Sequence, residues 1–174
     1  MENLLTHAQA ILVTTVPRWR TLIESVDDAL LARAPTPGEW SAADCLRHLV
    51  EAERKVFPVR VRYFLAGQDF PAYDPDAAAA IAEPRTPPEL TDEFDALRTV
   101  SLELLAMLNE DDLARTARHA ELGTVTLGEL IHEWAAHDLM HTVQGERALM
   151  QPFIAGCGPW RSYFADHLAK PASH

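Results

Sequence analysis

The stretch TLGELIHEWAAHDLMHTVQGERALM, residues 126–150, decides the fold of this chain. It opens with a T-x-x-E capping box, in which Thr126 and Glu129 satisfy each other's backbone donors at the start of a helix. Residues with buried-face character then recur at alternating steps of three and four, as on the inner side of a bundle helix: Leu127, Leu130, Trp134, His137, His141, Gln144 and Ala148. The stretch therefore predicts a long helix over 127–150 with one buried face.

Two positions on that buried face are histidines. His137 and His141 are four residues apart, so their imidazoles lie one turn apart on one side of the helix and can chelate one metal ion. His48 occupies the buried face of another expected helix. Each of these histidines, taken alone, could also be an ordinary core or surface histidine with a hydrogen-bond partner. Three imidazoles buried together need a common partner, because an unpaired buried polar group costs about 1–3 kcal/mol. We predict a metal site at these three residues.

The other histidines are given no role. His132 precedes His137 by five residues, which turns it ~140° around the helix and away from the buried face. The remaining four fall in tails, in arms or off the buried faces: His7, His119, His167 and His174.

Polar residues beside the histidines are weaker candidates. The segment His137–His141 differs from the H-E-x-x-H motif of zinc proteases, because Asp138 replaces the glutamate that acts as general base, and peptidase chemistry is disfavoured. Asp138 and Glu133 can instead accept the spare imidazole N–H groups, although Glu133 also fits a solvated charge. Gln144 could bind a metal-bound water or be an ordinary helix-face amide. Asp138, Gln144 and Glu53 are the candidate second-layer or acid/base groups.

Three further helices are expected from apolar spacing, over 4–26, 41–67 and 88–108. Pro17 and Pro58 predict a kink or break in the first two. Residues 67–88 are rich in Pro, Asp and Ala and are expected to form a surface excursion with at most one short helix, and residues 114–125 a short extended arm. The prediction is an all-α four-helix bundle in one domain, residues 1–174, with a core over 1–150. In the tail 151–174, a short accessory helix should pack its aromatic side chains on the bundle.

Composition limits the function further. Fifteen Lys and Arg against 26 Asp and Glu give a net charge of −11, which repels phosphate backbones and anionic lipid headgroups. We therefore expect a small-molecule substrate and neither a nucleic-acid nor a membrane partner. No secretory signal opens the chain and no apolar run is long enough to span a bilayer, so a cytoplasmic location is expected, with Cys45 and Cys157 reduced.

The chain also resembles a known family, the DinB-like superfamily of four-helix bundles. The resemblance covers about residues 1–150 and depends on these segments: Glu39-Trp40-Ser41 leading to His48-Leu49, Glu53 with the Arg60/Arg62 stretch, and Gly123–Leu127 leading to Trp134–Gln144. It implies one metal ion held by His48, His137 and His141, frequent homodimers, and in some relatives the transfer of bacillithiol, mycothiol or glutathione to electrophiles.

Three neutral imidazoles leave a divalent ion with at least one open position, where a bound water or thiol becomes a nucleophile near neutral pH. The all-nitrogen set suits Zn, Ni, Fe or Cu alike. The leading expectation is a metal-dependent transferase that uses a low-molecular-weight thiol, or a related hydrolase. A non-enzymatic metal-binding or stress-response protein is the alternative, and a metal-free bundle is the third.

Overall fold

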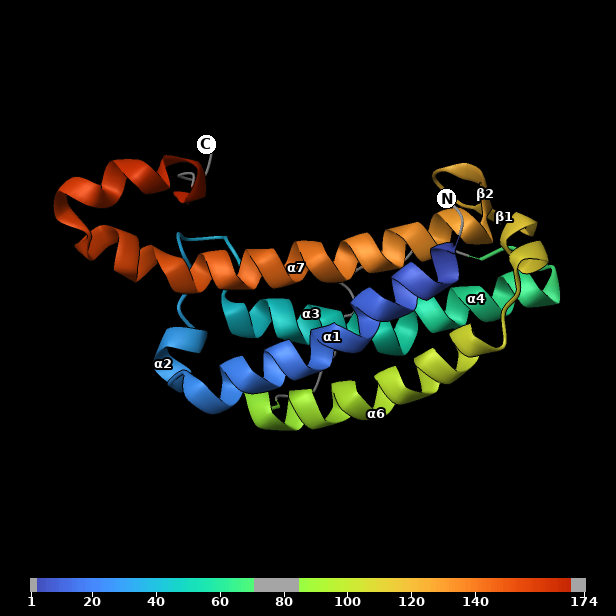
Figure 1. The fold of residues 1–174 in the computed structure, drawn as a ribbon, viewed down its shortest axis with the longest axis horizontal. Helices are drawn as coiled ribbons and strands as arrows, with labels where there is room; N and C mark the ends of the chain where they lie inside the picture. Colours follow the sequence, from blue (N-terminus) through green and yellow to red (C-terminus); the bar gives the residue numbers. More distant parts are fainter. Residues whose placement is uncertain (1–2, 71–84, 170–174) are drawn as a thin grey trace.

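Four long helical segments run side by side in the computed structural model, which describes residues 3–70 and 85–169 (Figure 1). They are α1 (Leu4–Ser25), α3 (Ala42–Lys55) continued by α4 (Phe57–Ala66), α6 (Pro87–Ala106) and α7 (Leu127–Gly156). Both α1 and α3 pack against α6 and against α7. The helices α1 and α3 therefore lie diagonally across the bundle from each other. The predicted all-α four-helix bundle is confirmed.

Short elements connect the bundle helices. They are α2 (Asp28–Leu31), the 3-10 helix η1 (Glu110–Ala114), the strands β1 (Thr116–His119) and β2 (Gly123–Thr126), and the 3-10 helix η2 (Gly158–His167). The strands form an antiparallel hairpin with Thr116 opposite Thr126. This hairpin is the arm expected over 114–125, whereas α2 and η1 were not predicted. Most of the expected surface excursion, including Asp74-Pro75, lies outside the described residues.

Local chemistry explains where the helices begin and end. Capping boxes start α3 at Ser41, α6 at Thr86 and α7 at Thr126, so the predicted cap of α7 is present. Between α3 and α4, Val56 has φ −112° and ψ −78°, and Pro58 lies in the first turn of α4, where its missing N–H costs no helical hydrogen bond. The break expected near Pro58 is therefore confirmed.

The structure differs from the expectations for the first helix and for the end of the last one. No break occurs at Pro17, since α1 is a single helix from Leu4 to Ser25, and the kink expected as the other possibility stays a prediction. The last bundle helix does not stop near residue 150, because α7 continues through Pro152 to Gly156.

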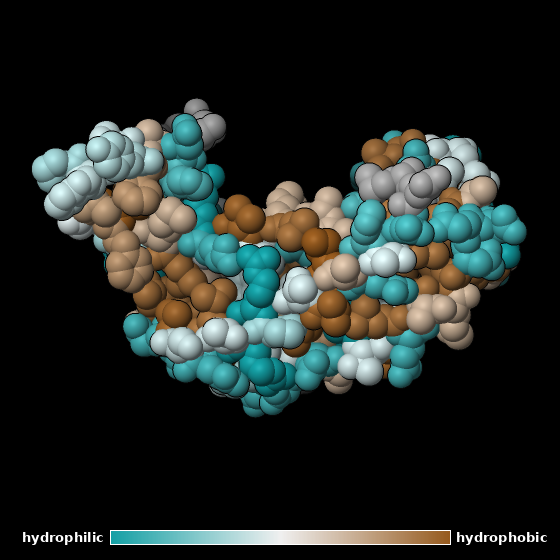
Figure 2. Space-filling view, viewed as in Figure 1, coloured by the Kyte–Doolittle hydropathy of each residue, from teal (hydrophilic) through white to brown (hydrophobic). Residues whose placement is uncertain are grey.

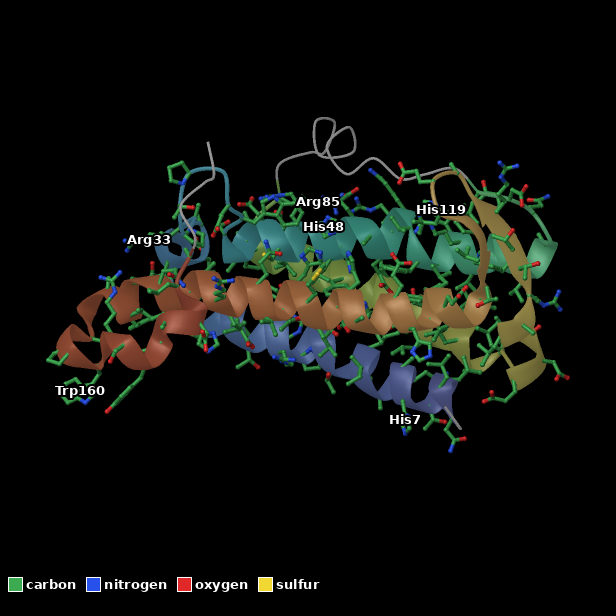
Figure 3. The ribbon with its side chains drawn as sticks, turned by 90° about the horizontal axis from the view of Figure 1, so that it is seen from above. His7, Arg33, His48, Arg85, His119 and Trp160 are labelled. Carbon is green, nitrogen blue, oxygen red and sulfur yellow. The ribbon has the colours of Figure 1, made fainter. Side chains whose placement is uncertain are left out.

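Two aromatic residues of the tail, Trp160 and Tyr163, do not pack on the bundle, whereas Phe164 is half-buried. Trp160 is 65% exposed and Tyr163 80% exposed, and η2 buries none of its residues. Backbone carbonyls attach this segment instead, since Arg147 donates to His167 O and Leu168 O, and Gln151 donates to His167 O. Figure 3 shows Trp160 pointing away from the bundle.

Buried apolar side chains form two clusters along the bundle. One contains Leu12, Phe57 and Trp134, and the other contains Trp19, Leu46 and Phe94. Along α7, Trp134 belongs to the first cluster and Leu149 to the second, and the buried polar residues Asp138, His141 and Thr142 lie between them in sequence. A polar layer therefore separates the two apolar clusters near the middle of the bundle. None of the helices in the described part of the chain is both long and apolar enough to cross a membrane.

Candidate metal centre

Three imidazoles meet where α3 packs against α7. One ring nitrogen from each of His48, His137 and His141 lies within 4.8 Å of the other two, and the Nε2 atoms of His48 and His137 are 3.0 Å apart. The spacing of four residues puts His137 and His141 on one side of α7, and helix packing brings His48 opposite them. The structure thus brings together the three histidines selected from the sequence.

Burial keeps these imidazoles neutral. Burial and the neighbouring His141 lower the pKa of His48 to about 4, and burial with both neighbouring imidazoles lowers the pKa of His137 to about 3. Burial also lowers the pKa of His141, against the opposing effects of Gln144 and Asp138. Near neutral pH each ring therefore has one nitrogen lone pair free to bind a metal ion, which is the protonation state that ligation requires.

Gln144 determines which nitrogen of His141 can be a ligand. Its amide oxygen, Oε1, lies 2.8 Å from His141 Nδ1. An amide oxygen only accepts hydrogen bonds, so Nδ1 carries the proton and the lone pair is on Nε2. The sequence had suggested that Gln144 binds a metal-bound water, whereas the structure shows its oxygen orienting a histidine ring.

The geometry fits a metal with nitrogen ligands. Tetrahedral coordination at ~2.0–2.1 Å places ligand nitrogens about 3.3 Å from each other, close to the 3.0 Å between His48 and His137. His137 Nδ1, the ring nitrogen that does not face His48, is buried and has no hydrogen-bond partner within the described ranges. Aromatic rings limit the motion of the imidazoles: Trp40 stacks on His141, and the edge of Phe57 meets His137.

The two carboxylates proposed from the sequence lie beneath the histidines in a buried ion pair. Arg98 of α6 binds both oxygens of Glu53 and one oxygen of Asp138, at 2.8–2.9 Å. The same guanidinium donates to the carbonyl of Leu12, and Trp134 Nε1 donates to Glu53. Although burial opposes it, the negative charge of Asp138 and Glu53 raises the pKa of Arg98. Asp138 and Glu53 therefore face Arg98, and any acid/base role for them stays a prediction.

A cavity adjoins the imidazole cluster. It measures about 280 Å³ and is lined by His48 and His137, by Glu133 of α7, and by Arg60 and His119 on the far side. A second hollow of about 560 Å³ is lined by Trp40, Gln144 and Arg147. Small molecules can therefore reach both the His48/His137 side and the Gln144 side of the cluster. Figure 2 shows the hollowed face of the molecule, between the η2 end and the hairpin end.

Sequence reasoning missed three residues around the cluster. Trp40 precedes its helix, Arg60 is on α4, and His119 ends β1, so none of them shares a helical face with the three histidines. Figure 3 labels His48 and His119 along the same side of α7. His119, to which the sequence analysis gave no role, thus lines the same cavity as His48 and His137 without belonging to the imidazole cluster. The exposed His132 stays outside the cluster, as its position on the helix predicted.

Comparison with known proteins agrees with this description. The sequence profile of the DinB superfamily matches residues 11–144. The structure is similar to that of YfiT from Bacillus subtilis, with a TM-score of 0.77 and 16% sequence identity over 88% of this chain and 89% of that chain. YfiT is described as a probable metal-dependent hydrolase with an unusual four-helix bundle topology. No curated protein matches the chain.

Proposed function

The chain belongs to the DinB superfamily, and we propose that it is a metal-dependent enzyme that transfers a low-molecular-weight thiol to small electrophiles. One divalent ion, Zn, Ni or Fe, is held by His48, His137 and His141. The observation that carries the proposal is the meeting of three neutral imidazoles, two of which, His48 and His137, line a cavity. When bound there, such an ion lowers the pKa of a coordinated thiol or water toward neutrality.

Among the described residues, no cysteine lines either of the two cavities beside the imidazoles, so we assign the nucleophile to a small molecule. Cys45 is fully buried in an apolar cluster, and burial raises the pKa of its thiol to about 12, so it is not a thiolate near pH 7. Among the acidic residues considered from the sequence, Glu133 is the one that lines the cavity beside His48 and His137. We propose that the carboxylate of Glu133 accepts the proton that the incoming nucleophile releases. Asp138 and Glu53 hold Arg98 instead.

Hydrolysis is the second candidate, because the same site can supply a water in place of a thiol. The fold similarity to YfiT, described as a probable metal-dependent hydrolase, favours it. The cavity beside the imidazoles argues against a purely structural metal, since structural zinc sites are usually closed by a fourth protein ligand. The non-enzymatic metal-binding or stress-response protein remains an outcome of the test, and the homodimer and the cytoplasmic location stay predictions.

The test has two parts. Elemental analysis of untagged protein should give about one transition metal per chain, and His48→Ala, His137→Ala and His141→Ala should each remove it, while His132→Ala retains it. The loaded protein is then given glutathione, mycothiol or bacillithiol with an epoxide or an activated aryl halide, and activated esters and amides without thiol. Metal-dependent thiol loss supports the transferase, and hydrolysis without thiol supports the hydrolase. Equal metal content in all four variants would refute the site.

A further inference from the structure

The cavity that His48 and His137 line is also lined by a buried cation. Arg60 of α4 is 9% exposed and His119 at the end of β1 is 8% exposed, and both line the cavity. The Arg60 guanidinium lies over the ring of Phe70 at 5.1 Å, and the edge of His119 meets the same ring. Phe70 thus contacts both side chains, which line the same cavity as His48 and His137.

The two side chains present hydrogen-bond donors to each other. The backbone N–H groups of Glu121 and Leu122 donate to His119 Nδ1 at 3.1 and 3.3 Å, so Nδ1 holds the lone pair and the neutral ring carries its proton on Nε2. That nitrogen lies 3.3 Å from Nη2 of Arg60, which is also a donor. Because both atoms are donors, neither satisfies the other, and an acceptor that bridged Nη2 and Nε2 would satisfy them together.

Among the described residues, the charge of Arg60 also has no direct ion-pair partner. Glu121 and Glu133 line the same cavity and are exposed at its edge, and their charges act on Arg60. Within residues 3–70 and 85–169, no carboxylate oxygen lies within 4.0 Å of its guanidinium. Burial of a guanidinium without a bound anion is costly, because the charge loses its hydration. A ligand that brings an anionic oxygen into the cavity removes this cost.

We propose that Arg60 and His119 bind a carboxylate group of the substrate or cosubstrate, so that this enzyme acts on carboxylate-bearing small molecules. The inference rests on the proposed function and names its substrate class. A carboxylate oxygen accepts from Nη2 of Arg60 and Nε2 of His119, and the rest of the molecule extends toward His48 and His137. A single negative charge suits the cavity better than a phosphate dianion, because one buried cation faces the two carboxylates at the edge.

The test compares two thiols that differ only in charge, 3-mercaptopropionate and 3-mercaptopropionamide. Their dissociation constants are measured by isothermal titration calorimetry, on metal-loaded and on chelator-stripped full-length protein. The carboxylate should bind about tenfold more tightly than the amide, as expected for one charge-assisted hydrogen bond. Arg60→Gln should reduce this preference below about twofold. The control Arg62→Gln removes the same charge from an exposed position two residues away on α4 and should keep the preference.

Each outcome decides the proposal. Equal affinity of the two thiols for the wild-type protein, or an undiminished preference in folded Arg60→Gln protein, overturns it. If Arg60→Gln protein does not fold, His119→Leu, which removes the second donor, is compared with His119→Gln, which keeps an N–H donor. A preference that survives His119→Leu overturns the proposal. The stripped protein separates this result from the metal, because a carboxylate preference without metal supports the anion site even if the proposed chemistry fails.

Discussion

At the scale of single residues, the hydrogen bond between Gln144 and His141 is the clearest determinant of metal affinity. Gln144→Leu should lower the affinity about 10–100-fold, the usual loss when the partner of a ligating histidine is removed. The buried His141 Nδ1–H would lose its acceptor, and the ring would no longer be oriented with Nε2 toward the other imidazoles. Competition with a chromophoric chelator measures the change.

Gln144→Glu is the matched control for this prediction, because it keeps an oxygen at the same reach and should retain wild-type affinity or exceed it. Wild-type affinity in Gln144→Leu protein would show that the amide does not orient His141.

The sequence predicts the histidines of the site and not the residues around them, for a physical reason. His137 and His141 share a helical face, so their proximity follows from spacing alone. Arg60 and His119 belong to different elements, and their contact depends on where the hairpin lies against α4. No periodicity in the sequence encodes that placement, and so His119 was given no role.

At the scale of elements, Arg98 connects the bundle helices. It reaches Leu12 of α1, Glu53 of α3 and Asp138 of α7 from its place on α6. Arg98→Met should destabilise the protein by about 3–5 kcal/mol, because it leaves two buried carboxylates without a counterion. Urea unfolding followed by circular dichroism measures this loss.

Neutralising the carboxylates provides the control for Arg98. The triple variant Arg98→Met, Glu53→Gln, Asp138→Asn should recover part of the lost stability, because no uncompensated charge remains buried. A loss below about 1 kcal/mol in Arg98→Met protein would contradict a structural role for the ion pair.

A close approach of α7 to α1 depends on Gly145. A Cβ atom at this position would lie 2.5 Å from the ring of the fully buried Trp19. Gly145→Ala should therefore destabilise the fold by about 1–3 kcal/mol, despite the better helix propensity of alanine. Thermal unfolding checks this, with Gly128→Ala of the same helix as control, where the nearest atom is 3.4 Å away. Equal melting temperatures for the two variants would contradict the prediction.

The predictions that failed for whole elements used local sequence rules and took no account of how the helices pack. A proline inside a helix removes one backbone hydrogen bond, but packing of α1 along its length and of α7 near its end outweighs that loss at Pro17 and Pro152. The spacing of Trp160 and Tyr163 suggested a packed helix, whereas hydrogen bonds from Arg147 and Gln151 to backbone carbonyls hold this segment. Such contacts leave no pattern in hydrophobicity.

At the scale of the whole molecule, the polar layer between the two apolar clusters contains both the ion pair of Arg98 and the imidazole cluster. The fold class, a helix bundle, could be predicted from the helical periodicity of apolar residues, because four amphipathic helices have to bury their apolar faces against one another. The position of the layer follows from residues that interrupt those faces at the same level, His48 and Glu53 on α3 and Asp138 on α7. Stability should therefore depend on the protonation and metal occupancy of this layer.

The last prediction concerns that dependence. In the unfolded chain the imidazoles titrate near ~6.5, whereas in the folded state the pKa of His48 is about 4 and that of His137 about 3. Between these values the unfolded state binds more protons than the folded state, so the stability of metal-free protein is complete above about pH 6.5 and decreases as the pH falls. The variant His137→Gln lacks the imidazole with the lower pKa. Its melting temperature should therefore fall less between pH 7.5 and pH 5 than that of the wild-type protein.

Metal binding adds a stabilisation that persists to lower pH, because protons compete with the ion for the imidazole nitrogens only as the pH approaches the folded-state pKa values of about 4 for His48 and about 3 for His137. A chelator should therefore lower the melting temperature of loaded protein at pH 7.5 and still lower it at pH 5. Scanning fluorimetry of wild-type protein at both pH values, with the exposed His132→Gln variant as control, makes the comparison. A chelator effect that is present at pH 7.5 and lost at pH 5 would contradict this prediction, because it would mean that the ligands take up protons between these two pH values.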